Sequence, residues 1–258
     1  MPKQPKQYKP RILSLDIERA PSLGTFWDQG KQYVSADQML EESYVLTWQA
    51  KWQHGSWYHG NLNTEGPAKM IRRIHALIGK ADIVVGWYTD GFDLKVLNKE
   101  YLLLGLTPPA PYKSVDLWKT AHSTFKFLSN SLDHVAKTMG CPLRKLPHDK
   151  EMWLRCMGIL KDRPIERAFR DMLRYNKRDV ELVDWILPRF LPYIKGLPNM
   201  NLYLPDSKGQ RICPKCLSTH LHKHSTRPVN NTVRDRYVCV DCGGWSYWMP
   251  SNKTLRSI

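Results

Sequence analysis

Four of the six cysteines stand in two close pairs near the C-terminus, and this spacing constrains the local fold more than any other feature. The pairs are Cys213-x2-Cys216 and Cys239-x2-Cys242, with 22 residues between them. Two short turns that each present two thiolates can complete a tetrahedral Zn²⁺ site. The alternative, two disulfides, would require an oxidising compartment. The spacing therefore predicts one structural Zn²⁺ in a small β-rich module of the zinc-ribbon type.

This predicted module, residues 211–258, is short and basic. Its 48 residues are few for a stable core, so we expect it to need the metal to fold. From residue 208 to the end, nine Lys or Arg stand against Asp235 and Asp241. We expect the module to anchor nucleic acid or a protein partner. Three of its basic side chains are predicted to contact nucleic acid: Lys215, Arg234 and Arg236.

The whole chain is also basic, with 39 Lys and Arg, 24 Asp and Glu, a net charge of +15 and a pI of about 9.6. This balance favours a polyanionic partner, of which nucleic acid is the most obvious. An anionic membrane is the rival, but the sequence has no long basic amphipathic helix and no apolar run of about 20 residues. Residues 1–6 are polar and basic, unlike a secretory signal. We expect a cytoplasmic protein of a bacterium or a phage-infected host cell.

Strand and helix patterns alternate through the first ~195 residues, which predicts an α/β fold with a mixed central sheet flanked by helices. The expected strands are 12–17, 44–48, 56–59 and 82–87, and the expected helices are 67–78, 93–104, 131–139 and 165–186, the last perhaps in two pieces. The composition then shifts toward Gly, Pro and Asn. We therefore expect a flexible basic tail at 1–10, a large domain at 11–195, a linker at 196–210 and the cysteine module at 211–258. Two isolated cysteines, Cys141 and Cys156, are expected to be buried.

Two acids lie on one face of the first predicted strand. The strand period places Leu13, Leu15 and Ile17 on one face and Ser14, Asp16 and Glu18 on the other. In a central strand the two carboxylates would repel each other and lose water, and a divalent cation would relieve both problems. Taken alone, the pattern favours an edge strand with a solvated face.

Two further acids lie where apolar side chains are expected. Asp93 follows the apolar strand 82–87 and shares a helical stripe with Leu97; a helix-capping role is the alternative. Asp179 interrupts an apolar helical stripe that runs from Ile165 to Ile186, with Tyr175 one turn before it. A buried carboxylate at such a position needs a cation or several donors. A salt bridge to a nearby Arg or Lys is the alternative for Asp179.

Taken together and in order, these acids resemble a known set of motifs. Asp16-x-Glu18, Phe92-Asp93 and Tyr175-x-x-x-Asp179 are similar to the three motifs of the DEDDy 3′–5′ exonucleases, which include the proofreading domains of family B DNA polymerases. Residues 114–117 and 131–136 also resemble the helical stretch between the second and third motifs. The resemblance spans residues 11–191 and implies a ribonuclease H-like fold. Asp90 is a possible decoy, but the preceding Phe92 favours Asp93.

The resemblance implies a reaction with two Mg²⁺ or Mn²⁺ ions and a role for each matching residue. Asp16 would bridge both ions, Glu18 and Asp179 would support the ion that activates water, and Asp93 would support the other. Tyr175 would orient the attacking water, and a nucleoside monophosphate would leave. The chain departs from the family a few residues before Asp93, where members usually carry an Asn that helps to hold the terminal nucleotide; this chain has Tyr88 there, or Trp87 or Thr89 at the neighbouring positions.

The expected substrate is a single-stranded 3′ end, with DNA preferred over RNA. Aromatic side chains near the first two motifs could stack on unpaired bases, with core packing as the alternative for each. The candidates are Phe92 and Trp27, with Phe26, Tyr33, Trp48 and Trp52 in the same stretch as Trp27. A replication or repair protein is a possible partner. A non-catalytic nucleic-acid-binding adaptor and a structure-specific endonuclease are the alternative functions.

Overall fold

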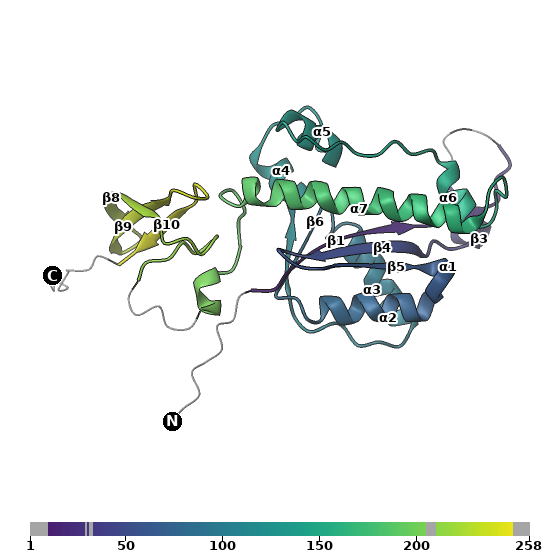
Figure 1. Ribbon diagram of the computed structural model, residues 1–258, viewed down its shortest axis with the longest axis horizontal. Helices are drawn as coiled ribbons and strands as arrows, with labels where there is room; N and C mark the ends of the chain where they lie inside the picture. The colour runs from purple at the N-terminus through teal and green to yellow at the C-terminus, as the bar shows by residue number, and fades with distance from the viewer. Residues whose placement is uncertain (1–9, 29, 31–32, 205–209, 250–258) are drawn as a thin grey trace, which may run out of the picture. The chain divides into compact units, whose positions relative to one another are not determined.

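The computed structural model (Figure 1) describes residues 10–28, 30, 33–204 and 210–249. The described chain falls into two compact units, one of residues Arg11–Trp185 and one that begins at Ile186. Three predictions fall partly on residues outside these ranges: the N-terminal tail, the linker and the last residues of the cysteine module. None of the described helices combines the length and the hydropathy that a membrane span requires.

The first unit is built on a five-stranded mixed sheet. Its strands are β1 (Ile12–Arg19), β4 (Val45–Trp52), β5 (Trp57–Asn61), β6 (Ile83–Gly86) and β7 (Lys113–Asp116), in the order β5-β4-β1-β6-β7. Strand β1 pairs antiparallel with β4 and parallel with β6. The expected central mixed sheet is thus confirmed. The interpretation of the first strand as an edge strand is wrong, because β1 has hydrogen-bonded neighbours on both sides.

The apolar face of β1 forms the larger core, together with α2 (Pro67–Ile78) and α3 (Asp93–Leu103). Leu13, Leu15 and Ile17 are buried there. Helix α2 covers them with four apolar side chains at helical spacing, Met70, Ile71, Ile74 and Ile78. Its bounds match those predicted from the sequence, because Pro67 stands at N1 and Gly79 follows the last turn.

The opposite face of β1 lies under the long helix α7 (Ile165–Phe190), as Figure 1 shows. The contacts between helix and sheet are partly polar. Gln49 donates to the carbonyl of Leu173 at 3.1 Å, and Lys51 and Ser14 both donate to the carboxylate of Asp184. The helix is continuous rather than in two pieces, and Pro188 lies in its last turn.

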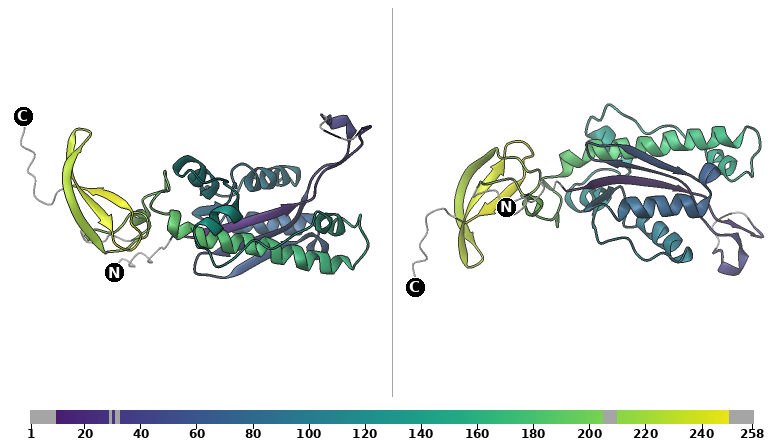
Figure 2. Two further views of the ribbon diagram at one scale, coloured as in Figure 1. Left: turned by 90° about the horizontal axis from the view of Figure 1, so that it is seen from above. Right: turned by 60° about the horizontal axis from the view of Figure 1, so that its bottom comes forward.

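Shorter elements complete this unit. They are β2 (Leu23–Gly24), η1 (Ala36–Gln38), β3 (Met39–Glu41), α1 (Leu62–Glu65), α4 (Leu117–Thr124), α5 (Leu132–Thr138) and α6 (Glu151–Cys156). Strands β2 and β3 extend beyond the central sheet (Figure 2). Residues 114–116 belong to β7, so the helical interpretation of that segment is wrong; their pairing with β6 is a tertiary contact. Cys141 and Cys156 are buried, as predicted.

The second unit contains η2 (Met200–Tyr203) and a three-stranded antiparallel sheet. The strands are β8 (Leu221–Val229), β9 (Thr232–Cys239) and β10 (Trp245–Trp248), with β9 in the middle. The first cysteine pair precedes β8, and the second begins at the last residue of β9 and ends before β10. The predicted small β-rich module is confirmed.

One glycine in the first unit is required by close packing. Gly60 lies opposite Trp48 in the β4–β5 pairing, and the Trp48 indole donates to the carbonyl of Met70 at 3.1 Å. A Cβ at position 60 would lie 2.1 Å from Nε1 of Trp48.

We expect Gly60→Ala to lower the free energy of unfolding by about 1–3 kcal/mol. Urea denaturation tests this, with Gly79→Ala in an ordinary helical conformation as the matched control. Equal effects of the two substitutions would contradict the packing argument.

Candidate functional site

Three carboxylates predicted from the sequence come together between β1 and α7. Asp16 and Glu18 share the polar face of β1, and Asp179 reaches them from α7. Their nearest carboxylate oxygens all lie within 4.8 Å of one another. The period of the strand and the apolar stripe of the helix therefore converge on one acidic cluster.

The fourth predicted acid, Asp93, lies beside this cluster. It begins α3, is buried, and accepts a hydrogen bond from the backbone N–H of Ile17 at 3.0 Å, between Asp16 and Glu18 in the chain. Asp90 instead accepts from Ser114 and pairs with Lys119 at 2.6 Å. The contacts thus direct Asp93 inward and leave Asp90 in an ion pair near the surface.

Burial raises the pKa of Asp16, Glu18, Asp93 and Asp179, and repulsion from neighbouring acids of the cluster adds to this for Asp16 and Glu18. Burial, then Asp179, raises the pKa of Glu18 to about 8. Burial likewise raises the pKa of Asp93 to about 7, although hydrogen bonds from the backbone oppose it. The pKa values of Asp16 and Asp179 also lie above their usual range, chiefly because both are buried. Without a cation, Glu18 and Asp93 therefore keep their protons to a higher pH than ordinary carboxyls do.

The cluster has one orphaned oxygen that fits a divalent ion. The Oδ2 atom of Asp179 pairs with Nζ of Lys145 at 2.8 Å, whereas its Oδ1 atom is buried and has no hydrogen-bond partner among the described residues. Asn176 donates to Asp16 and orients that carboxylate. Carboxylate oxygens are the ligands that Mg²⁺ and Mn²⁺ prefer. Asp16, Glu18 and Asp179 could therefore hold such an ion.

Tyr175 lies one helical turn before Asp179 and is buried among aromatic rings. The rings of His148 and Trp153 meet it edge-on, at centroid distances of 4.8 and 5.8 Å. Burial, and then the charge of Asp179, raises the pKa of its phenol above the usual value. The hydroxyl therefore stays protonated at neutral pH and can donate a hydrogen bond.

Among the ion pairs of the described residues, Lys145 is the one cation that pairs directly with the acidic cluster. It is not one of the residues predicted from the sequence. Its ammonium lies 4.9 Å from the centre of the Tyr175 ring and pairs with Asp179. Burial lowers the pKa of Lys145, but Asp179 and Tyr175 outweigh this and the net pKa is raised. The residue lies in a segment without regular periodicity, so no local pattern points to it.

A cavity of about 520 Å³ opens beside the acidic cluster. Asp16, Asp179 and Lys145 form its charged part. Three aromatic side chains form much of the remainder: Trp87, Tyr88 and Trp118. The Tyr88 and Trp118 rings meet edge-to-face with centroids 5.0 Å apart. The site therefore joins an acidic end to an aromatic wall.

Asp116 positions this aromatic wall. Its buried carboxylate accepts from the backbone N–H groups of Tyr88 at 3.0 Å and Trp118 at 2.9 Å. Tyr88 has a φ of 59°, the left-handed region that suits Asn or Gly better than Tyr. The backbone at position 88 is thus held in a conformation that is unusual for an aromatic residue.

The two aromatic residues predicted to bind nucleic acid lie outside this cavity. Phe92 precedes α3 and packs partly against the larger core, with the Arg19 guanidinium 5.1 Å from its ring centre. Trp27 follows β2 and is 96% exposed. Trp48 is a core residue. Sequence reasoning therefore missed Trp87 and Trp118, while Tyr88 had been singled out as a departure from the family.

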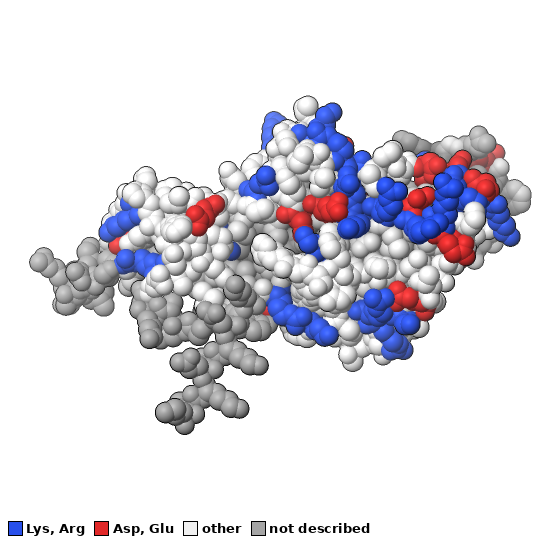
Figure 3. Space-filling view, viewed as in Figure 1, with Lys and Arg blue, Asp and Glu red and all other residues white. Residues whose placement is uncertain are grey.

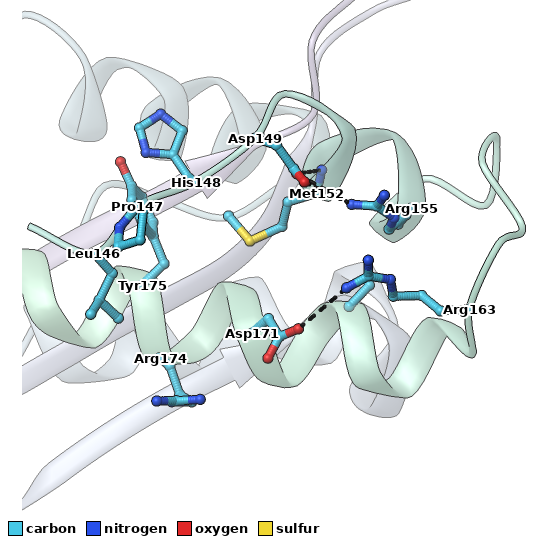
Figure 4. Close-up of a pocket in the computed structure, with 11 residues that line it drawn as sticks. Leu146, Pro147, His148, Asp149, Met152, Arg155, Arg163, Asp171, Arg174 and Tyr175 are labelled. Carbon is cyan, nitrogen blue, oxygen red and sulfur yellow. Dashed lines mark hydrogen bonds and ion pairs between the residues drawn. The ribbon is translucent and has the colours of Figure 1, made fainter.

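A second cavity of about 280 Å³, lined in part by Tyr175, lies between α6 and α7 (Figure 4). Its charged side chains largely pair with one another. Arg155 contacts Asp149 and Asp162, and Arg163 lies 3.9 Å from Asp171. The charges that line this cavity are therefore largely compensated by one another.

The four paired cysteines of the second unit form one cluster. Their sulfur atoms all lie within 4.8 Å of one another, and none is in a disulfide. The backbone N–H of Gly244 points to the sulfur of Cys242 at 3.4 Å. Leu217 and Gly243, one residue after each pair, both have positive φ. Four thiolates at this separation could bind Zn²⁺ in the tetrahedral geometry expected of it.

The three basic residues predicted to bind nucleic acid have different surroundings. The ammonium of Lys215 donates to the carbonyls of Leu191, Pro192 and Ile194 after α7, so its charge is already engaged. Arg234 and Arg236 lie on β9 and donate to Thr232 and Ser225. Basic side chains also gather over α7 and the segment between α5 and α6, with acidic atoms among them (Figure 3).

Comparisons with known proteins support the fold alone. No family model and no curated protein matches the sequence. Among solved structures, the chain is similar to the family B DNA polymerase from the hyperthermophilic archaeon Pyrobaculum calidifontis, with a TM-score of 0.51 and 19% sequence identity. The match covers 75% of this chain and 27% of the polymerase chain. The chain thus has a polymerase-related α/β fold over a part of that protein's length.

The raised pKa values predict how stability depends on pH. A carboxyl with a raised pKa holds its proton more tightly when folded, so the stability of the Mg²⁺-free protein should fall as the pH rises from about 5 to about 8. Added Mg²⁺ should oppose this loss. Thermal unfolding of zinc-loaded protein tests both expectations. Glu18→Gln should flatten the pH dependence, and an unchanged profile in this variant would contradict the assigned cause.

Proposed function

We propose that the chain is a metal-dependent 3′–5′ exonuclease that hydrolyses phosphodiester bonds at nucleic-acid 3′ ends, preferably of DNA. The observation that carries the proposal is the gathering of Asp16, Glu18 and Asp179 within 4.8 Å, with Asp93 adjacent and Tyr175 one turn away. Acids buried at such density are costly unless they bind cations. Their chain order and spacing match the DEDDy motifs.

The ribonuclease H-like fold is part of this proposal. A mixed sheet with β1 at its centre and helices on both faces is consistent with it. The similarity to a family B DNA polymerase fits as well, because such polymerases include proofreading exonuclease domains. We propose that the chain acts as a stand-alone nuclease or beside a replication or repair protein.

The proposed chemistry assigns each residue a distinct task. Asp16, Glu18, Asp93 and Asp179 would hold two Mg²⁺ or Mn²⁺ ions, which stabilise charge on the attacking and leaving oxygens. Tyr175 keeps its proton and donates a hydrogen bond that orients the attacking water. Asn176 holds the Asp16 carboxylate in place. Lys145 balances the charge of Asp179 and lies close enough to contact a substrate phosphate.

The aromatic wall suggests which substrates fit. Trp87, Tyr88 and Trp118 line the cavity with Asp16 and Asp179, so a phosphate at the acids places its nucleoside near these rings. Aromatic side chains stack on unpaired bases, whose faces are free. We therefore propose that a frayed or single-stranded 3′ end enters the cavity.

The direct test of this proposal is a cleavage assay. Wild-type protein with Mg²⁺ or Mn²⁺ should shorten a 5′-labelled single strand into a ladder. Asp16→Ala should lower the rate at least about 10²-fold, because the ions supply several kcal/mol of transition-state stabilisation. Asp90→Ala, which removes an ion-paired acid outside the cluster, is the matched control. Undiminished degradation by Asp16→Ala would refute the site.

Companion substrates separate the alternatives. Cleavage of circular single-stranded DNA would indicate an endonuclease, since an exonuclease cannot start without an end. Tight, salt-sensitive binding without cleavage under any divalent ion would indicate a nucleic-acid-binding adaptor. RNA run in parallel decides between the two nucleic acids.

The aromatic wall generates a separate prediction. Tyr88→Ala should raise KM for a single strand about 5- to 100-fold, with a smaller change in kcat, because it removes a stacking ring but none of the acids. Tyr193→Ala is the matched control, since Tyr193 is exposed and lies outside the cavity. Steady-state kinetics on the labelled strand measure both. Equal KM values for wild type and Tyr88→Ala would rule out the stacking role.

A further inference from the structure

We propose that the open face of the β8-β9-β10 sheet is a second binding surface, which takes single-stranded nucleic acid along its length. The surface belongs to the cysteine unit and lies on different residues from the acidic cluster. Its binding requires no cleavage, so the inference stands independently of the proposed nuclease function.

Strand register identifies the side chains of this face. Directly paired residues of antiparallel strands share a face. Trp245 pairs with Val238, and Tyr247 pairs with Arg236, so both β10 aromatics lie on the face that carries Arg236. Arg234 shares that face by strand alternation, and its partner Arg227 on β8 joins it. The register thus brings two aromatic rings and three arginines together.

The two faces of β9 differ sharply in burial. On one side Asp235, Tyr237 and Cys239 are buried, and Cys239 is one of the clustered thiols. On the other side Trp245 and Tyr247 are 48% and 44% exposed. Neighbouring solvent-exposed aromatics of this size indicate an interaction surface rather than a core.

The charge of the open face favours a polyanion. Asp235 is the one acid within the three strands, and it lies on the opposite side, where Lys223 pairs with it at 2.9 Å. Within the described part of these strands, Arg227, Arg234 and Arg236 therefore have no carboxylate beside them on their own face. A protein partner would need a matching acidic patch, whereas every nucleotide supplies a phosphate.

The aromatic rings favour a single strand over a duplex. Trp245 and Tyr247 are two residues apart on β10, which is about 6.8 Å along a strand. The Arg236 guanidinium lies 5.5 Å from the Trp245 ring centre, and His224 meets that ring edge-on at 5.1 Å. These contacts fix the orientation of the indole. Two successive unpaired bases could each meet one ring, while phosphates meet the arginines; paired bases present no free face.

The test measures binding to a fluorescent circular oligothymidylate, because a circle has no 3′ end to enter the proposed nuclease cavity. Full-length, zinc-loaded protein carrying Asp16→Asn is titrated by anisotropy without Mg²⁺. Added Trp245→Ala or Tyr247→Ala should each weaken binding about 5- to 100-fold. Val240→Ala, an exposed apolar residue outside the three strands, is the control and should leave affinity unchanged.

A second pair of variants tests the positive charge of the open face and leaves both aromatic rings in place. Arg227→Gln and Arg234→Gln should each reduce the slope of log K against log salt by about 0.7. Lys195→Gln, which removes an exposed cation outside the sheet, is the control. Zinc content measured on each sample verifies that the cysteine cluster is retained.

Unchanged affinity in the ring variants with full zinc content would overturn the proposal and leave the face to a protein partner. Equal affinity for a duplex circle of the same length would overturn the single-strand assignment. Failure of the nuclease assay would not affect either measurement, because both use the Asp16→Asn background.

Discussion

Electrostatic repulsion among buried and half-buried carboxylates is the constraint around which the first unit is arranged. Asp16, Glu18 and Asp179 meet where α7 crosses the central strand β1, and Asp93 lies beside them. The negative charge of these four acids is only partly compensated, because Lys145 and a few N–H groups are the donors to them. One oxygen of Asp179 has no partner among the described residues. Such a cluster conflicts with ordinary core packing, and conflicts of this kind concentrate at functional sites.

The rest of the first unit keeps these repelling carboxylates close together. One face of β1 is apolar and fixed by α2 and α3, while the other faces α7. Gln49, Lys51 and Ser14 tie that second face to α7 through Leu173 and Asp184. The helix therefore cannot shift to separate the acids without losing several polar contacts. A rigid sheet and a long helix, rather than loops, determine the spacing of the cluster.

The net charge of +15 favours a polyanionic partner, but it gives no sign of the acidic cluster. In the first unit, basic residues surround a small group of buried acids. In the second unit, the arginines share an open sheet face with aromatic rings. Both arrangements suit a single strand of nucleic acid, the first through an end and the second through its length. The two proposals rest on different residues and can fail separately.

The sequence by itself determined the features that depend on local periodicity and spacing. Alternation in residues 12–18 placed Asp16 and Glu18 on one face, a helical stripe directed Asp179 inward, and the cysteine spacing indicated one metal cluster. Only the tertiary structure decided that β1 is central, that Lys145 pairs with Asp179, and that Trp87, Tyr88 and Trp118 line the cavity. These facts depend on contacts between segments that are distant in the chain. Periodicity shows which way a side chain points on its own element, but only packing decides what lies opposite.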